Sequence, residues 1–340
     1  MDNISLSDFV YNNVLYRRSF KKLIAKILQN PLIYRNPFYR RRYRALMVRK
    51  MKSYRQKPFR VMIENTNSCN ANCIFCPHKI MKRKRGVMSM DLYKRIINDC
   101  VEEKIDFVTV YGFGEPLLDR DFIKRLKYAK TKGIKRLTTN TNAMYLTENI
   151  ARQIIEAGLD EIFISFDAET AKTYRQVRPG LDFATVEKNI KTLSKLRQKL
   201  KRRKPEIVLS FVETDINRAE SAGYIKKWQK TVDHISVSQI HNWTGDIDNG
   251  RKIIGQRDPC RLLWTDMVVS WDGKVPLCCN DYENKVILGD MKKQSISEVW
   301  GGKKLARARK MHVNGNYKAI SLCKNCQYNY HHKSPWWVGK

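Results

Sequence analysis

The chain has 340 residues, and its hydrophobic fraction of 42% excludes a mainly disordered protein. Its formal net charge of +33 favours an anionic partner. No apolar run is long enough to cross a bilayer, and the N-terminus lacks the apolar core of a secretory signal, so we expect a cytoplasmic protein. In the cytoplasm, nine clustered cysteines indicate metal sites rather than disulfides.

The first 57 residues are predicted to form a basic extension. Residues 1–60 contain 16 Lys and Arg against Asp2 and Asp8, a balance of +14. The stretch LYRRSFKKLIAKIL at 15–28 places apolar side chains at helical spacing and cations on the opposite face. This pattern predicts an amphipathic helix that lies peripherally on the anionic inner face of the membrane, with packing on the protein's own core as the alternative. Nucleic-acid binding is the weaker interpretation of the aromatic and basic residues that follow.

A strand–helix alternation begins at residue 59. Six short runs rich in β-branched and aromatic residues lie at 59–66, 107–112, 136–141, 161–166, 206–212 and 234–240. Helical patterns lie between them at 89–104, 119–132, 147–157, 182–203 and 217–231, and Cys100 in the first is expected to be ordinary core. The alternation predicts an α/β fold of parallel βαβ units, either an open barrel or a doubly wound sheet. In such folds the chemistry gathers at the C-terminal ends of the strands.

A cluster of three cysteines directly follows the first strand. The loop CNANCIFCPH holds Cys69, Cys73 and Cys76 in a C-x3-C-x2-C array. Thiolates at such short spacing can bind three irons of a 4Fe–4S cluster and would leave the fourth iron open. A zinc site is the alternative, although structural zinc sites usually pair their ligands two by two.

This loop resembles the signature of the radical S-adenosylmethionine (SAM) enzymes, in which Phe75 matches an aromatic position. The resemblance implies a partial (β/α)6 barrel over residues 58–250. It also implies that the open iron chelates SAM, and that one electron from a donor such as flavodoxin or ferredoxin cleaves SAM. The products are methionine and a 5′-deoxyadenosyl radical, which takes a hydrogen atom from the substrate.

Four further segments resemble radical SAM motifs at strand ends. They are GFGEP at 112–116, with Phe113 replacing a glycine; TTNTNAMYLT, with Ala143 replacing a glycine; SFDA at 165–168; and VRPG. The resemblance implies that SAM is contacted by Phe75, Gly114, Glu115, Asn142, Ser165 and Arg178. Taken alone, Glu115 could cap a turn, Asn142 could shape a loop and Arg178 could form a surface ion pair.

The alternation ends near residue 250, and residues 251–340 are predicted to form a small cysteine-rich domain. Cys260, Cys278, Cys323 and Cys326 lie at intervals of 18, 45 and 3 residues. This arrangement resembles the SPASM or "twitch" domain of aminocyclitol dehydrogenases and implies an auxiliary 4Fe–4S cluster, with a four-cysteine zinc site as the alternative. Neighbouring side chains on an extended chain point in opposite directions, so Cys279 would face away from the cluster that Cys278 binds.

These observations predict an oxidoreductase that takes hydrogen from a C–H bond of a polar substrate, such as an alcohol, a sugar or a lipid-linked molecule. The auxiliary cluster would accept the second electron, and His241 and Asp281 are candidate bases by position. An epimerase with Cys279 as hydrogen donor and a peptide-modifying maturase are the enzymatic alternatives. A membrane- or nucleic-acid-bound iron–sulfur sensor is the non-enzymatic alternative, although a sensor needs no SAM pocket.

Overall fold

The computed structural model describes residues 56–250 and 257–328, together with Phe38, Arg41, Arg42, Ala45 and Arg49. The predicted helix at 15–28 lies outside the described residues. Within the described part of the chain, no helix combines the length and the apolar character needed to cross a bilayer.

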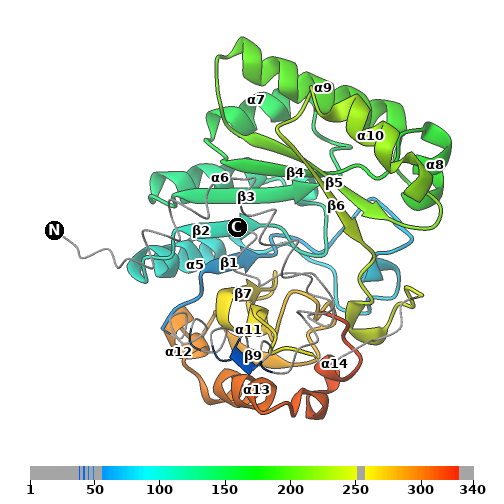
Figure 1. The fold of residues 1–340 in the computed structure, drawn as a ribbon. Coiled ribbons are helices and arrows are strands. Elements are labelled where there is room, and N and C mark those ends of the chain that lie inside the picture. The colour runs from blue at the N-terminus through cyan, green and yellow to red at the C-terminus, as the bar shows by residue number, and fades with distance from the viewer. Residues whose placement is uncertain are drawn as a thin grey trace.

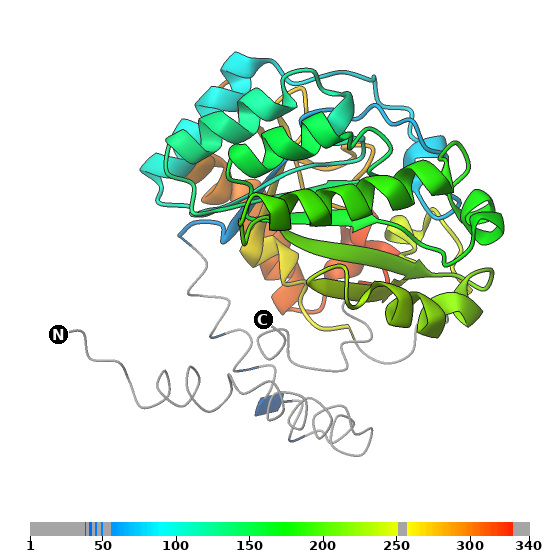
Figure 2. The same ribbon diagram turned by 90° about the horizontal axis from the view of Figure 1, so that it is seen from above.

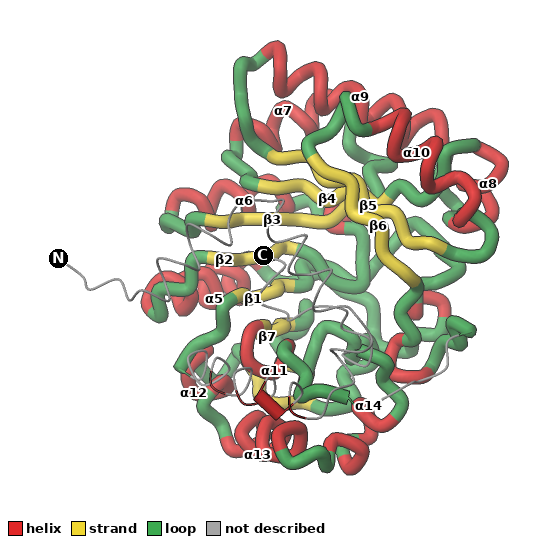
Figure 3. The backbone as a smooth tube through the Cα atoms, viewed as in Figure 1, coloured by secondary structure: helices red, strands yellow, loops and turns green. Residues whose placement is uncertain are grey.

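The protein is built on a parallel sheet of seven strands in the order β6-β5-β4-β3-β2-β1-β7 (Figure 1). Its strands are β1 (Arg60–Ile63), β2 (Phe107–Val110), β3 (Arg136–Thr141), β4 (Glu161–Ser165), β5 (Glu206–Glu213), β6 (His234–Gln239) and β7 (Asp266–Val269). The first six confirm the strands predicted from the sequence, and their order confirms a partial barrel of parallel βαβ units. The loops that follow these strands gather at one edge of the sheet (Figure 3).

Helices pack along the outer face of the curved sheet (Figures 1 and 2). They are α5 (Met90–Glu102), α6 (Phe122–Thr131), α7 (Glu148–Glu156), α8 (Ala171–Val177), α9 (Phe183–Lys199) and α10 (Ser221–Trp228). In α5, Ser89 accepts a hydrogen bond from the Leu92 amide and so caps the helix. The apolar face of α5 is buried and includes Cys100, which confirms that this cysteine belongs to the core.

The C-terminal region contributes the seventh strand. β7 pairs in parallel with β1, from Arg60 opposite Asp266 to Ile63 opposite Val269, so the sheet crosses the predicted domain boundary at 250. The remaining elements are an antiparallel pair, β8 (Lys274–Pro276) and β9 (Ile287–Asp290), and the helices α11 (Leu262–Thr265), α12 (Ile296–Trp300), α13 (Lys303–Val313) and α14 (Ser321–Lys324). Short 3-10 helices span Pro77–Lys79, Pro116–Leu118, Arg218–Glu220, Trp243–Gly245 and Tyr317–Ala319. The pairing of β7 with β1 fixes the C-terminal region at this edge of the barrel sheet.

Candidate active site

A cavity of about 400 Å³ lies at the C-terminal ends of the strands. Its lining includes every residue that the sequence predicted for SAM and its cluster: Cys69, Cys73, Phe75, Cys76, Gly114, Glu115, Asn142, Ser165 and Arg178. These residues follow four different strands, and the parallel sheet brings the ends of those strands to one edge.

The three cysteines lie on one loop that is held by the segment after α8. The Asn72 amide donates to the Pro179 carbonyl oxygen at 2.8 Å, and the Ile74 amide donates to the Val177 carbonyl oxygen at 3.2 Å. Burial raises the pKa of Cys69 to about 11 and the pKa of Cys76 to about 12. Iron bound to these thiolates would replace the protons that they otherwise keep.

Arg178 holds the middle of the cysteine loop. Its guanidinium forms a buried ion pair with Asp167, and its Nη1 donates to Cys73 Sγ at 3.2 Å. The guanidinium also lies 5.3 Å from the centre of the Phe75 ring. Asp167 was missed by sequence reasoning, although it belongs to the SFDA segment from which only Ser165 was selected. The arginine predicted to contact SAM therefore donates a hydrogen bond to one of the cysteines predicted to bind the cluster.

Glu115 is a buried carboxylate in the lining of the cavity. It accepts hydrogen bonds from Thr141 Oγ1 at 2.6 Å and from the Asn142 and Leu117 amides at 2.7 and 3.1 Å. Burial raises its pKa, while these three donors oppose that rise. Asn142 in turn donates through Nδ2 to Asn70 Oδ1 at 2.8 Å, which joins the loop after β3 to the cysteine loop.

Two backbone positions explain why the resembling motifs prefer glycine. A Cβ on Gly114 would lie 2.4 Å from the Thr66 carbonyl oxygen and 2.6 Å from that of Ser68, so only glycine allows this approach to the start of the cysteine loop. Ala143 has a φ of 59°, in the left-handed region that glycine adopts most readily. Phe113, by contrast, points toward Trp243 and Tyr282, with ring centres 5.6 and 6.1 Å apart.

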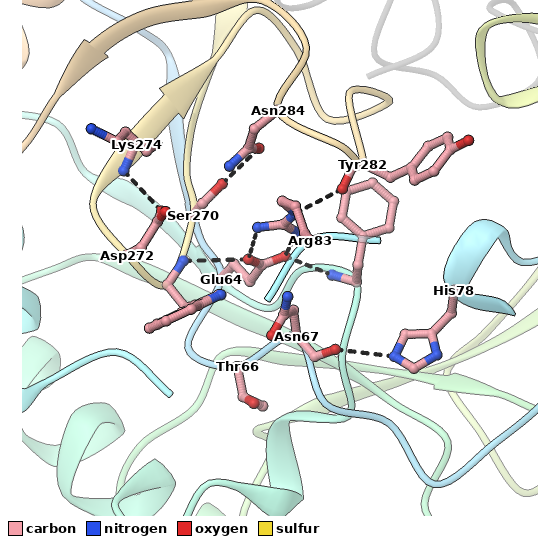
Figure 4. A network of polar contacts seen from close by, with 12 residues as sticks. Glu64, Thr66, Asn67, His78, Arg83, Ser270, Asp272, Lys274, Tyr282 and Asn284 are labelled. Atoms are coloured by element: carbon pink, nitrogen blue, oxygen red, sulfur yellow. Dashed lines mark hydrogen bonds and ion pairs between the residues drawn. The ribbon is translucent and has the colours of Figure 1, made fainter. Parts of the chain in front are cut away.

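The segment after the cysteine loop is held by an ion pair between Arg83 and Glu64 that the sequence did not reveal. Glu64, at the end of β1, accepts two hydrogen bonds of 2.8 Å from Arg83 and further bonds from the Phe113 and Trp271 amides (Figure 4). Arg83 also donates through Nε to the Tyr282 carbonyl oxygen at 2.7 Å. The pair therefore joins the barrel to the C-terminal region.

The adjacent residues Cys278 and Cys279 of KVPLCCND lie in different surroundings. Cys279 lines the cavity, and burial raises its pKa to about 11, so it remains a thiol near neutral pH. Burial also raises the pKa of Cys278, and the nearby Cys260 and Cys326 raise it further. Burial raises the pKa of Cys260 as well, and the nearby Cys326 and Cys323 raise it further. The four predicted auxiliary ligands therefore lie close enough to interact electrostatically.

Both cysteine groups fit iron–sulfur clusters by their donor chemistry, which is thiolate throughout. Within the described ranges, no three His, Cys, Asp or Glu side chains converge on a point that could hold a single metal ion. A 4Fe–4S cluster binds each thiolate to a different iron, so its cysteines need to surround a cluster-sized space rather than one point.

The two candidate bases, His241 and Asp281, both line the cavity, and they differ in the hydrogen bonds that they accept. His241 accepts a hydrogen bond from the Trp243 amide at Nδ1, 2.8 Å away, and its Nε2 lies 3.5 Å from Nδ2 of Asn280. The Asp281 carboxylate accepts bonds from the Lys285 and Val286 amides at 2.7 and 2.9 Å, and burial raises its pKa. Asp281 therefore shapes its own loop.

Comparison with known proteins gives relatives of the same architecture. An S-adenosyl-L-methionine-dependent 2-deoxy-scyllo-inosamine dehydrogenase of Niallia circulans is 25% identical over 272 residues, which are 78% of this chain and 91% of that protein. The fold resembles BtrN in complex with AdoMet and 2-DOIA, with a TM-score of 0.55 and 22% identity over 79% of this chain and 92% of that one. It also resembles SuiB of Streptococcus suis bound to its precursor peptide SuiA, with a TM-score of 0.64 and 15% identity over 86% and 76% of the two chains.

Two family models match the chain in the order of its elements. The model of the radical SAM superfamily matches residues 63–225, and the SPASM model, an iron–sulfur cluster-binding domain, matches residues 260–327. These matches fall on the barrel and on the cysteine-rich region that closes its open side. The chain therefore belongs to the radical SAM superfamily and is an enzyme that uses SAM with a 4Fe–4S cluster and carries an auxiliary cluster domain.

Proposed function

We propose that the protein is a SAM-dependent dehydrogenase that oxidises an alcohol carbon of a small polar molecule. The observation that carries the proposal is the likeness over 91% of the length of an aminocyclitol dehydrogenase, which includes the C-terminal domain as well as the barrel. In this reaction the CH–OH group loses a hydrogen atom to the 5′-deoxyadenosyl radical, a proton to a base and one electron to an acceptor. The product is a ketone or an aldehyde.

The proposal assigns the residues of the site as follows. Cys69, Cys73 and Cys76 hold the SAM cluster, and Glu115, Asn142 and Ser165 contact SAM at the strand ends. Cys260, Cys278, Cys323 and Cys326 hold the auxiliary cluster, which supplies an acceptor for the substrate electron. His241 receives the proton, because it lines the cavity and the Asp281 carboxylate already accepts hydrogen bonds from two backbone amides.

The cavity wall that lies away from the SAM cluster supports a polar substrate. Beside apolar residues such as Val212, Val268 and Pro276, it contains side chains with hydrogen-bonding groups: Ser210, Ser238, Gln239, His241, Ser270, Asp281 and Asn284. Hydroxyl and amino groups of a sugar or cyclitol match such a wall, whereas an acyl chain would leave its polar groups unsatisfied.

The test uses the anaerobically reconstituted full chain with dithionite, SAM and a panel of aminocyclitols and sugar alcohols. We expect 5′-deoxyadenosine together with one carbonyl product per SAM cleaved, and no deuterium from solvent on the oxidised carbon. Cys73→Ala, as the control, should abolish 5′-deoxyadenosine formation. Cleavage of SAM with no carbonyl product from any polyol, or turnover of a peptide instead, would overturn the assignment.

Epimerisation is the second candidate, and one observation favours it. The Cys279 thiol faces the cavity and keeps its proton, as a donor of a hydrogen atom to a substrate radical must. In that reaction the substrate carbon regains hydrogen on its opposite face, so the product carries one deuterium when the reaction is run in D2O.

We further propose that residues 1–57 hold the enzyme on an anionic membrane surface and that a flavodoxin- or ferredoxin-type protein supplies its electrons. The charge of +14 over residues 1–60 supports the first part, since each Lys or Arg near such a surface contributes about 1 kcal/mol. A lipid-linked substrate would be compatible with that location.

A further inference from the structure

A buried histidine lies against one of the proposed auxiliary-cluster cysteines. His312 is on α13, and its Nε2 lies 3.4 Å from Cys323 Sγ on α14. Its exposed fraction is 1%. Because α13 and α14 are separate helices, the contact depends on the fold of the C-terminal domain and not on sequence proximity.

The hydrogen bonds of His312 fix which nitrogen carries the proton. The Cys260 amide donates to Nδ1 at 3.3 Å, so Nδ1 must offer its lone pair. A neutral imidazole then carries its hydrogen on Nε2, which makes Nε2 the donor toward Cys323 Sγ. One ring therefore links two of the four cysteines, through the backbone of Cys260 and the sulfur of Cys323.

The surroundings of His312 hold the ring in this orientation. The Tyr317 ring lies 5.9 Å from the imidazole with an angle of 31° between their planes. The Arg257 guanidinium lies 4.9 Å from the centre of the Tyr317 ring and donates through Nη1 to the Cys323 carbonyl oxygen at 2.6 Å. The backbone of Cys323 and the ring that reaches its sulfur are thus fixed by the same group of side chains.

We propose that His312 raises the reduction potential of the auxiliary cluster by donating a hydrogen bond from Nε2 to the Cys323 thiolate. A reduced cluster places more negative charge on its sulfur ligands, so a donor to one of them stabilises the reduced state. The inference rests on the proposed role of the four cysteines as cluster ligands. In the proposed dehydrogenase, a higher potential makes the cluster a better acceptor for the substrate electron.

The test measures the potential directly and does not depend on turnover. The full chain carrying Cys69→Ala, Cys73→Ala and Cys76→Ala retains only the auxiliary site, and its midpoint potential is read by EPR during a redox titration. We expect His312→Leu to shift the one-electron equilibrium about tenfold toward the oxidised cluster, which is about 59 mV. His312→Gln, which can keep an N–H donor, should recover part of the shift. Lys310→Arg, at an exposed position of the same helix, keeps both the donor and the charge and should have little effect.

A second measurement needs no substitution at His312. In the same background with 15N-labelled histidine, ENDOR of the reduced cluster should show coupling to 15N and to one proton that exchanges in D2O. An unchanged potential in His312→Leu, or the absence of the histidine coupling, would overturn the proposal. If His312→Leu loses its iron, the potential of His312→Gln and the ENDOR spectrum still test whether His312 donates to Cys323. Failure to bind any auxiliary cluster in the parent chain would instead refute the ligand assignment in the proposed function.

Discussion

At the scale of single residues, the site depends on which way each polar side chain faces. Cys278 and Cys279 are adjacent, yet only Cys279 is among the residues that line the cavity. The sequence predicted this separation from side-chain alternation on an extended chain, but the two cysteines lie in the turn after β8, where the Asp281 amide donates to the Cys278 carbonyl oxygen at 3.1 Å. Arg178 shows the opposite case, because its partners Asp167 and Cys73 are found only through the fold.

Cys279→Ala separates the two proposed reactions. If the enzyme is a dehydrogenase, the variant should keep its auxiliary iron and its carbonyl-forming turnover near the parent values, because the thiol takes no part in oxidation. Iron content, 5′-deoxyadenosine and product are measured together, with Cys278→Ala as the control that loses auxiliary iron. Loss of turnover in Cys279→Ala, with iron and SAM cleavage intact, would instead favour hydrogen return from the thiol.

At the scale of elements, the segment from Ile80 to Met88 links the barrel to the C-terminal region. The segment is held by the Glu64–Arg83 pair, by the Thr66–Val87 bridge and by the bond of 2.5 Å from the Lys82 amide to Glu283. The side chains of Glu64 and Arg83 are 2% and 9% exposed, so their ion pair is poorly screened by water.

Arg83→Leu should destabilise the protein by about 3 kcal/mol, because it leaves the buried Glu64 carboxylate without its cation. Urea unfolding of the cluster-free chain measures this loss, and limited proteolysis should show faster cleavage within residues 79–86. The double variant Glu64→Met and Arg83→Leu should regain most of the stability, because no unpaired charge remains. Equal loss in the single and double variants would mean that packing, and not charge, holds the segment.

At the scale of the whole molecule, the charge is concentrated before the barrel. Residues 1–55 contain 14 Lys and Arg against Asp2 and Asp8, which is +12 of the total of +33. The described chain is anchored just after them, where Lys57 Nζ donates to the Glu103 and Lys104 carbonyl oxygens at 3.0 and 2.9 Å. Removal of residues 1–55 therefore leaves both of these Lys57 hydrogen bonds in place.

Deletion of residues 1–55 should abolish binding to vesicles that contain anionic phospholipid and leave SAM cleavage unchanged. Sedimentation with vesicles at low and high salt measures the binding, because screening weakens attraction to a charged surface. Lys201→Gln, Arg202→Gln and Arg203→Gln together remove an exposed basic cluster on the barrel and serve as the control. Vesicle binding that survived the deletion would contradict the membrane role of the extension.

Short elements limited the prediction of the fold. The six strands and the long helices follow hydrophobic periodicity, which the chain carries locally. α8 was not predicted, because seven residues are too few to define a helical period. β7 was not predicted, because it lies beyond residue 250, where the strand–helix alternation of the sequence ends. The strand β7 forms because its four buried residues, DMVV, complete the sheet beside β1.

The sequence by itself determined the family, the two cysteine groups and the strand ends that carry the SAM motifs, because short spacings and strand order place these residues in any fold of this kind. Only the tertiary structure decided their partners: Asp167 for Arg178, Arg83 for Glu64 and His312 for Cys323. Such pairs join residues 11 to 19 positions apart, on different helices and loops. Their distances depend on how those elements pack, which no local pattern in the chain specifies.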